Sequence, residues 1–162
     1  MAYACVRTDN MAGTTLGKDL VSLRFYDAAE KEAAIENGSV VLVGAYLEGQ
    51  REVRKATAVA ADSKLSDVAL IASEEVVKTK SHNNLNEFIN EAGSNARGYR
   101  LTTKDAFAVT KEAFVDATAA KVGAVVELAA GTKFSAVDSA SGATKVGTIT
   151  AVEGIWYVVE VD

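Results

Sequence analysis

The feature that most constrains the fold is a succession of short runs rich in β-branched and other apolar residues, which starts near Ser39 and continues to Asp162. Turn-forming residues separate the runs, and because the chain contains no proline, glycine, asparagine and aspartate must form the turns. Several short strands at this spacing are typical of a barrel or a sandwich. The pattern therefore predicts a mainly β protein: a small β-barrel or β-sandwich body with one or two short helices.

The individual strands can be placed from these runs. A dipeptide, Glu153-Gly154, separates the last two runs and predicts a two-residue hairpin connection between them. The run at 52–59 alternates in charge and is expected at an edge of the sheet. The complete set of expected strands is 20–26, 39–46, 52–59, 67–72, 97–101, 106–110, 123–128, 133–137, 145–152 and 155–161.

The N-terminal region differs from the rest of the chain. Residues 1–20 lack hydrophobic periodicity and are rich in threonine, glycine, asparagine and aspartate. We therefore expect an extended N-terminal arm over residues 1–20 and a single β-rich domain over residues 21–162. Within that domain Asp27 is expected to cap a short helix over residues 28–35, since an aspartate accepts the free N–H groups at a helix start.

Composition excludes several classes of protein. The 162 residues are 49% hydrophobic, which is enough for a core without disulfides. A net charge of -5, with lysine and arginine scattered, disfavours nucleic acid as a partner. The single cysteine, Cys5, is expected to be a free thiol in a protein made in a reducing compartment. No apolar run approaches the roughly 20 residues that cross a bilayer, and no signal peptide is recognisable, so we expect no membrane and synthesis in the cytosol.

Residues that could perform chemistry are few and dispersed. His82 lies alone in a polar stretch, where an exposed loop residue is the ordinary interpretation and a general base the alternative. Cys5 has no partnered base in the sequence nearby, and no cluster of cysteine, histidine and carboxylate side chains suggests a metal site. Glycines do not form a phosphate-binding loop. We therefore expect no catalytic residues, no metal, no cofactor and no enzymatic activity.

Three side chains outside the arm are candidates for contact with a partner. Arg97 lies between Gly93 and Gly98, in a segment that is either an ordinary turn or a loop presenting a guanidinium to a carboxylate. Trp156 and Tyr157 are adjacent in an expected strand and so point to opposite faces, which leaves one of them available at the surface.

Four segments of the chain are distinctive as a set: 7–14 (RTDNMAGT), 34–41 (AIENGSVV), 86–93 (NEFINEAG) and 97–101 (RGYRL). They resemble small virion proteins of tailed bacteriophages, in particular head decoration proteins, also called capsid cement proteins. The resemblance extends over most of the chain, and its motifs contain no catalytic residues.

The resemblance implies a β-rich body whose terminal arm lies on the capsid lattice. It implies the major capsid protein as partner, and a dimer or trimer of this chain at lattice junctions. The chain would lie on the capsid surface of the virion, after passing through the host cytoplasm during assembly. Alternatives are a head-fibre base, a tail structural protein, or a bacterial β-barrel module that binds a ligand or peptide. The arm residues expected to contact the capsid are Arg7, Asn10, Met11, Thr14 and Leu16.

Overall fold

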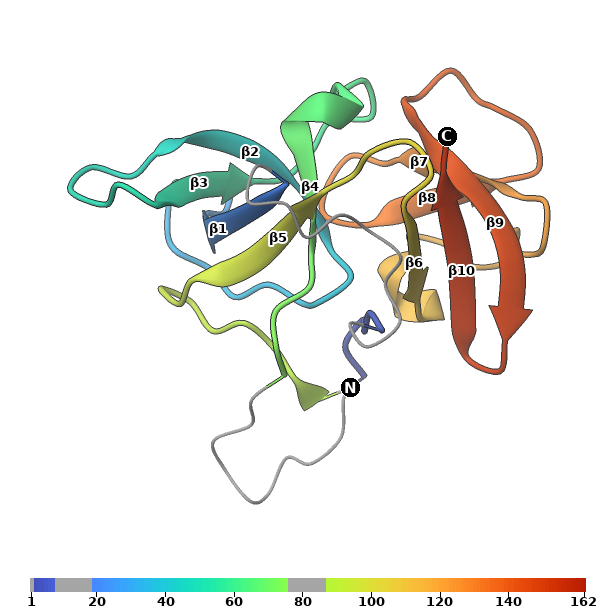
Figure 1. Cartoon of the computed structure of the whole chain (residues 1–162), viewed down its shortest axis with the longest axis horizontal. Helices are drawn as coiled ribbons and strands as arrows, with labels where there is room; N and C mark the ends of the chain where they lie inside the picture. The colour runs from blue at the N-terminus through green and yellow to red at the C-terminus, as the bar shows by residue number, and fades with distance from the viewer. Residues whose placement is uncertain (1, 8–18, 76–86) are drawn as a thin grey trace.

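The computed structural model describes residues 2–7, 19–75 and 87–162 and shows a mainly β protein made of two sheets (Figure 1). The first sheet closes into a five-stranded barrel in the order β1-β3-β2-β4-β5. Its strands are β1 (Leu20–Phe25), β2 (Val40–Tyr46), β3 (Val53–Thr57), β4 (Val68–Ile71) and β5 (Ala96–Arg100). Strands β1 and β3 are parallel, and the other neighbours are antiparallel.

The second sheet is antiparallel and has the order β6-β10-β9-β7-β8. It lies beside the barrel and is formed by the C-terminal third of the chain (Figure 1). Its strands are β6 (Ala106–Val109), β7 (Val125–Leu128), β8 (Phe134–Val137), β9 (Lys145–Glu153) and β10 (Trp156–Val161). The mainly β prediction is confirmed, and a barrel and a second sheet share the chain.

The barrel wall is buried on both faces where it meets the second sheet. In β4, Val68 and Leu70 belong to a core cluster shared with the second sheet, whereas Ala69 and Ile71 belong to the cluster inside the barrel. Successive side chains of a strand point to opposite faces, so this strand contributes alternately to two cores. Burial on both faces explains why residues 68–72 are continuously apolar rather than alternating.

Small side chains line the barrel interior. Ala56, Ala69 and Ala96 lie there, fully or almost fully buried. At Gly98 a Cβ would lie 2.5 Å from Cδ1 of Leu23. A five-stranded barrel has room for few large side chains. The alanines of its interior therefore allow the strands to pack closely, and they do not indicate helices.

The predicted helix over residues 28–35 is wrong. Oδ1 of Asp27 accepts hydrogen bonds from the N–H groups of Ala29 and Lys31, at 2.9 and 3.0 Å, and so closes a turn instead of capping a helix. The chain then extends, and Ile35 pairs with Asn90. A helix of two turns gains little by itself, whereas burying Ile35 in the barrel cluster requires the extended path. The described helices are short 3-10 turns, η2 (Leu65–Asp67) and η4 (Lys111–Ala113).

The connection of the C-terminal hairpin is shifted by one residue from the prediction. Glu153 still belongs to β9 and pairs with Trp156, so the two-residue turn is Gly154-Ile155. Gly154 has a φ of 64°, a left-handed conformation that glycine adopts without strain. The turn therefore places Ile155 at the exposed tip of the hairpin.

Candidate functional site

The first described residues of the chain pack on the edge of the second sheet. Val6 forms an antiparallel bridge with Val109 of β6, and the N–H of Arg7 donates to the carbonyl oxygen of Ala108 at 3.0 Å. Ala4 and Val6 are buried and belong to the core cluster of the second sheet. The expected arm over residues 1–20 thus starts with a segment that is part of the packed body.

The side chains of this segment alternate as in a strand. Ala4 and Val6 enter the core, whereas Tyr3 and Cys5 line the opposite side. That side is the wall of a groove with a volume of about 650 Å³. The other walls are residues 110–112, at η4, and residues 154–157, at the tip of the β9–β10 hairpin.

Aromatic side chains define the character of the groove. Tyr3, Trp156 and Tyr157 all line it. The guanidinium of Arg7 lies 5.9 Å from the centroid of the Trp156 ring, within reach of a cation–π attraction. Tyr157 packs edge-on against Phe114, with ring centroids 5.7 Å apart. The groove therefore offers flat apolar surfaces held in place by their own contacts.

Charged groups surround the thiol at the base of the groove. Burial and, to a smaller extent, the negative charges of Glu75, Glu112 and Glu36 together raise the pKa of the Cys5 thiol to about 11. Glu36 also accepts a hydrogen bond from the N–H of Ala4 at 2.9 Å. A thiol with this pKa stays protonated at neutral pH and is a poor nucleophile. The groove is thus better suited to contact than to covalent chemistry.

The hairpin tip continues the groove as an exposed apolar surface. Ile155 is 66% exposed and Val152 is 40% exposed. Large apolar side chains exposed beside half-buried aromatic residues are typical of protein contact sites. We call the groove walls, which include Ile155, together with Val152 and Arg7 the hairpin surface.

The structure brings together three of the residues selected from sequence. Arg7, Trp156 and Tyr157 meet at the hairpin surface, although the first was assigned to an arm and the other two to a partner contact. Neither aromatic residue is fully exposed, because Trp156 and Tyr157 are both half-buried. The remaining arm candidates, Asn10, Met11, Thr14 and Leu16, lie outside the described residues, and so does His82.

Arg97 lies elsewhere. It is exposed on β5 of the barrel and is not part of the groove. Its backbone N–H donates to Oγ of Ser73 at 2.9 Å, which fixes the strand. The segment between Gly93 and Gly98 therefore forms a turn followed by a strand.

Sequence reasoning missed Tyr3, Lys111 and Ile155 as members of this surface. Tyr3 and Lys111 are distant in the chain, and only the pairing of residues 4–7 with β6 brings them together. The exposure of Ile155 could have been predicted from the sequence, because an isoleucine beside a glycine in a tight turn has no strand partner to cover it.

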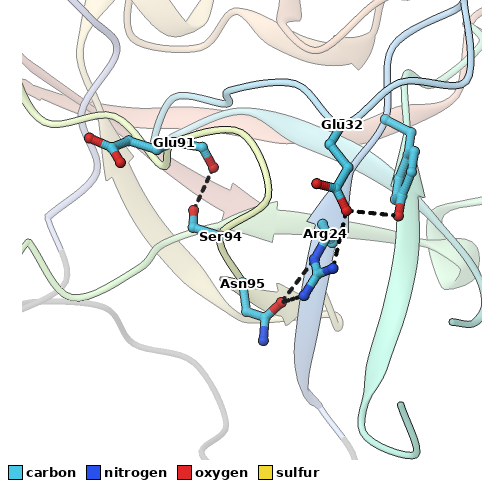
Figure 2. A network of polar contacts seen from close by, with 6 residues as sticks. Arg24, Glu32, Glu91, Ser94 and Asn95 are labelled. Atoms are coloured by element: carbon cyan, nitrogen blue, oxygen red, sulfur yellow. Dashed lines mark hydrogen bonds and ion pairs between the residues drawn. The ribbon is translucent and has the colours of Figure 1, made fainter. Parts of the chain in front are cut away.

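A polar network on the barrel is the other prominent group of charged side chains (Figure 2). Arg24 donates to Glu32 Oε1 at 3.1 Å and, through two nitrogens, to Oδ1 of Asn95 at 3.2 and 3.0 Å. Tyr26 donates to the same oxygen of Glu32 at 3.3 Å. These contacts fasten the turn after β1 and the loop before β5 to the barrel, which is a structural role.

The described residues contain no group of three or more histidine, cysteine, aspartate or glutamate side chains placed to hold a metal ion. Within the same part of the chain, no helix has the length and apolar character needed to cross a membrane. No protein-family model matches this chain, and neither does any curated protein or any solved structure. The interpretation of the hairpin surface therefore depends on its geometry and chemistry.

Proposed function

We propose that this chain is a virion structural protein that binds the outside of a tailed-phage capsid and stabilises the shell. In this proposal the major capsid protein is the partner, and copies of the chain act at lattice junctions as dimers or trimers. The protein has no catalytic role, and it moves from the host cytoplasm to the capsid surface during assembly. Binding at many equivalent sites multiplies a modest contact energy over the whole shell.

The observation that supports this proposal most is the hairpin surface. Arg7, Trp156 and Tyr157 are of the residue types enriched at binding hot spots; Trp156 and Tyr157 line the groove with the exposed Ile155, and Arg7 lies over the Trp156 ring. The pKa of the Cys5 thiol, which lines the groove, is raised, so the thiol is less reactive than a free cysteine; this favours binding over catalysis.

The test is cosedimentation of the purified protein with expanded empty capsids of the phage that encodes it. Ile155→Asp places a charge at the tip of the hairpin, within the hairpin surface, on a side chain that is 66% exposed and so does not support the core. We expect it to weaken capsid binding by about tenfold or more, which corresponds to about 1.4 kcal/mol.

Val122→Asp is the matched control, because Val122 is similarly exposed, at 61%, and does not line the groove. It should bind as the unmodified protein does. Shells without the protein should form with normal shape and rupture at lower temperature, and adding the protein back should restore their resistance. Absence of binding by the unmodified protein, or failure of shells to assemble without it, would contradict the proposal.

The groove itself favours a second candidate, a β-barrel module that binds a small ligand or a peptide. Its volume of about 650 Å³ lies within the usual range of ligand sites, about 300–1,000 Å³, and aromatic residues line it. The chain has one tryptophan, Trp156, so its fluorescence reports occupancy of the groove directly. A saturable change of this fluorescence with a peptide or small-molecule library, together with no capsid binding, would favour this candidate.

A further inference from the structure

The edge of β6 is a strand-binding site that the chain fills with its own N-terminal segment. Strand β6 is the outermost strand of the second sheet. Residues 4–7 cover its free edge: the N–H of Arg7 donates to Ala108 at 3.0 Å, and the N–H of Thr110 donates to the carbonyl oxygen of Cys5 at 3.2 Å. An uncovered edge strand presents unpaired backbone groups to other chains, so β6 requires such a cover.

The site fits this segment in shape as well as in hydrogen bonding. Ala4 and Val6 fill core positions and are 2% and 1% exposed. Gly38 provides the space for the backbone of the segment, since a Cβ there would lie 3.2 Å from the carbonyl oxygen of Cys5. The groups that receive the segment are therefore Gly38, Glu36 and β6, and the segment makes its backbone hydrogen bonds to residues distant from it in the chain.

The connection of the segment to the body allows a second arrangement. Strand β1 belongs to the barrel and starts only at Leu20, with residues 8–19 between it and the segment. Twelve residues span at most about 43 Å when fully extended, which exceeds the radius of gyration of about 15 Å for a body of this size. The segment of one copy can therefore reach β6 of an adjacent copy and make the same contacts there.

We propose that residues 2–7 exchange between copies, so that the N-terminal segment of one copy covers β6 of a second copy and joins the two. The contacts are the same in both arrangements, so the balance between them depends on chain entropy and protein concentration. This link between copies goes beyond capsid binding and does not require a capsid.

Cross-linking of the full chain tests the exchange. Because Val6 is opposite Val109 in an antiparallel bridge, Cys5 is opposite Thr110. We would mix the unmodified protein, which has Cys5, with the double variant Cys5→Ser, Thr110→Cys, incubate at high concentration and then oxidise. Exchange should give a disulfide-linked pair of twice the chain mass on a non-reducing gel, and neither protein alone should give it.

Two controls make a negative result decisive. Thr110→Cys in the background with Cys5 should form a disulfide, within one chain or between two, which shows that the geometry permits the bond. In the mixture, Thr118→Cys with Cys5→Ser should give no linked pair, because Thr118 is not part of the β6 edge. If the first control forms its disulfide only within single chains and the mixture gives no pair, the segment stays in its own copy and the proposal is overturned.

A second measurement decides the case in which the engineered disulfide does not form. A fluorescent peptide of residues 1–7 is mixed, under reducing conditions, with the unmodified full chain, and the full chain is titrated up to several millimolar. This concentration is needed because the peptide competes with the resident segment, whose effective concentration is on the order of millimolar. Exchange predicts a rise in anisotropy that the Val6→Asp peptide fails to give. No rise at any concentration would overturn the proposal.

Discussion

Cys5 shares its surroundings with three carboxylates as well as with the apolar residues of the core. Its pKa is raised to about 11 by burial and by Glu75, Glu112 and Glu36, whereas the sequence indicated only a thiol without a base. The residue is buried because its neighbours Ala4 and Val6 belong to the core. The behaviour of one thiol is therefore decided by contacts with residues about 30 to 110 positions away in the chain.

This pKa predicts how stability depends on pH. The folded state keeps the thiol protonated up to about pH 11, whereas the unfolded thiol releases its proton near 9.0. Unfolding therefore releases a proton between these values, and the free energy of unfolding should fall as the pH rises from about 9 to about 11. Urea denaturation at a series of pH values measures the slope. Cys5→Ala should reduce the slope in this window, and an unchanged slope would contradict the assignment.

The two valines in the middle of β10 differ in burial and should differ in their effect on stability. Val159 is fully buried, whereas Val158 is half-buried, although both are valines within the same expected strand. Val159→Ala should lower the free energy of unfolding by about 1.5–3 kcal/mol, because two buried methyl groups are lost, each worth about 0.8 kcal/mol, and a cavity is left behind. Thermal denaturation should show a decrease of roughly 4–10 °C. Val158→Ala should show less than half of this decrease, and equal effects would be inconsistent with the alternation of the strand.

At the scale of elements, the β9–β10 hairpin depends on one glycine more than on its turn. At Gly147 a Cβ would overlap the backbone carbonyl of Glu160 in the paired strand β10, whereas at Gly154 in the turn a Cβ would meet no atom within 4 Å. The backbone of β10 therefore leaves no room for a side chain at Gly147, two residues before the irregular pairing at Ile149 and Val159.

This contrast predicts different costs for two alanine substitutions. Gly147→Ala must displace β10 and should lower the free energy of unfolding by about 3 kcal/mol or more, comparable to other overpacked sites. Gly154→Ala strains only a left-handed turn residue with a φ of 64° and should cost about 1 kcal/mol. Chemical denaturation of both variants measures the difference. A milder effect of Gly147→Ala would show that the pairing can shift to accommodate a methyl group.

The N-terminal segment is the second element whose role differs from the sequence-based expectation. Deleting residues 1–7 should lower the free energy of unfolding by at least about 2–3 kcal/mol, because Val6 alone is a fully buried valine and Ala4 adds to it. It should also change the emission of Trp156, from which Arg7 is removed. Equilibrium denaturation and fluorescence spectra test both. Unchanged stability would indicate that the segment is a dispensable arm.

At the scale of the whole molecule, the barrel and the second sheet share one core cluster. It contains Val40, Val68 and Leu70 of the barrel together with Phe107 and Phe134 of the second sheet. Phe107 and Phe134 pack with ring centroids 5.7 Å apart. The apolar outer face of the barrel and the apolar face of the second sheet bury each other, which favours folding as one unit.

A shared core predicts one cooperative unfolding transition for the body over residues 21–162. Differential scanning calorimetry should give a single peak, with the calorimetric enthalpy equal to the van't Hoff enthalpy. Tryptophan fluorescence, which reports on the second sheet through Trp156, should change at the same midpoint as far-UV circular dichroism. Two separated transitions would mean that the barrel and the second sheet are independent domains.

The sequence by itself determined where most strands lie, although the run at 52–59 was expected at an edge and β3 instead lies between β1 and β2 of the closed barrel. The runs at 39–46, 67–72 and 155–161 formed as expected, because β-branched residues between turn formers have few alternatives to extended structure. It also indicated the C-terminal hairpin to within one residue, since a glycine in a tight turn is a local requirement.

Only the tertiary structure decided how these strands share their faces and what gathers at the hairpin surface. Residues 28–35 have helix-forming composition, yet burial of Ile35 and the turn at Asp27 impose an extended path. The segment around Val6 has no periodicity to reveal that it completes a sheet at β6. Arg7 and Trp156 meet because of that pairing alone. Such contacts join residues far apart in the chain, and the free energy that selects them comes from burial of the assembled core, which no local pattern contains.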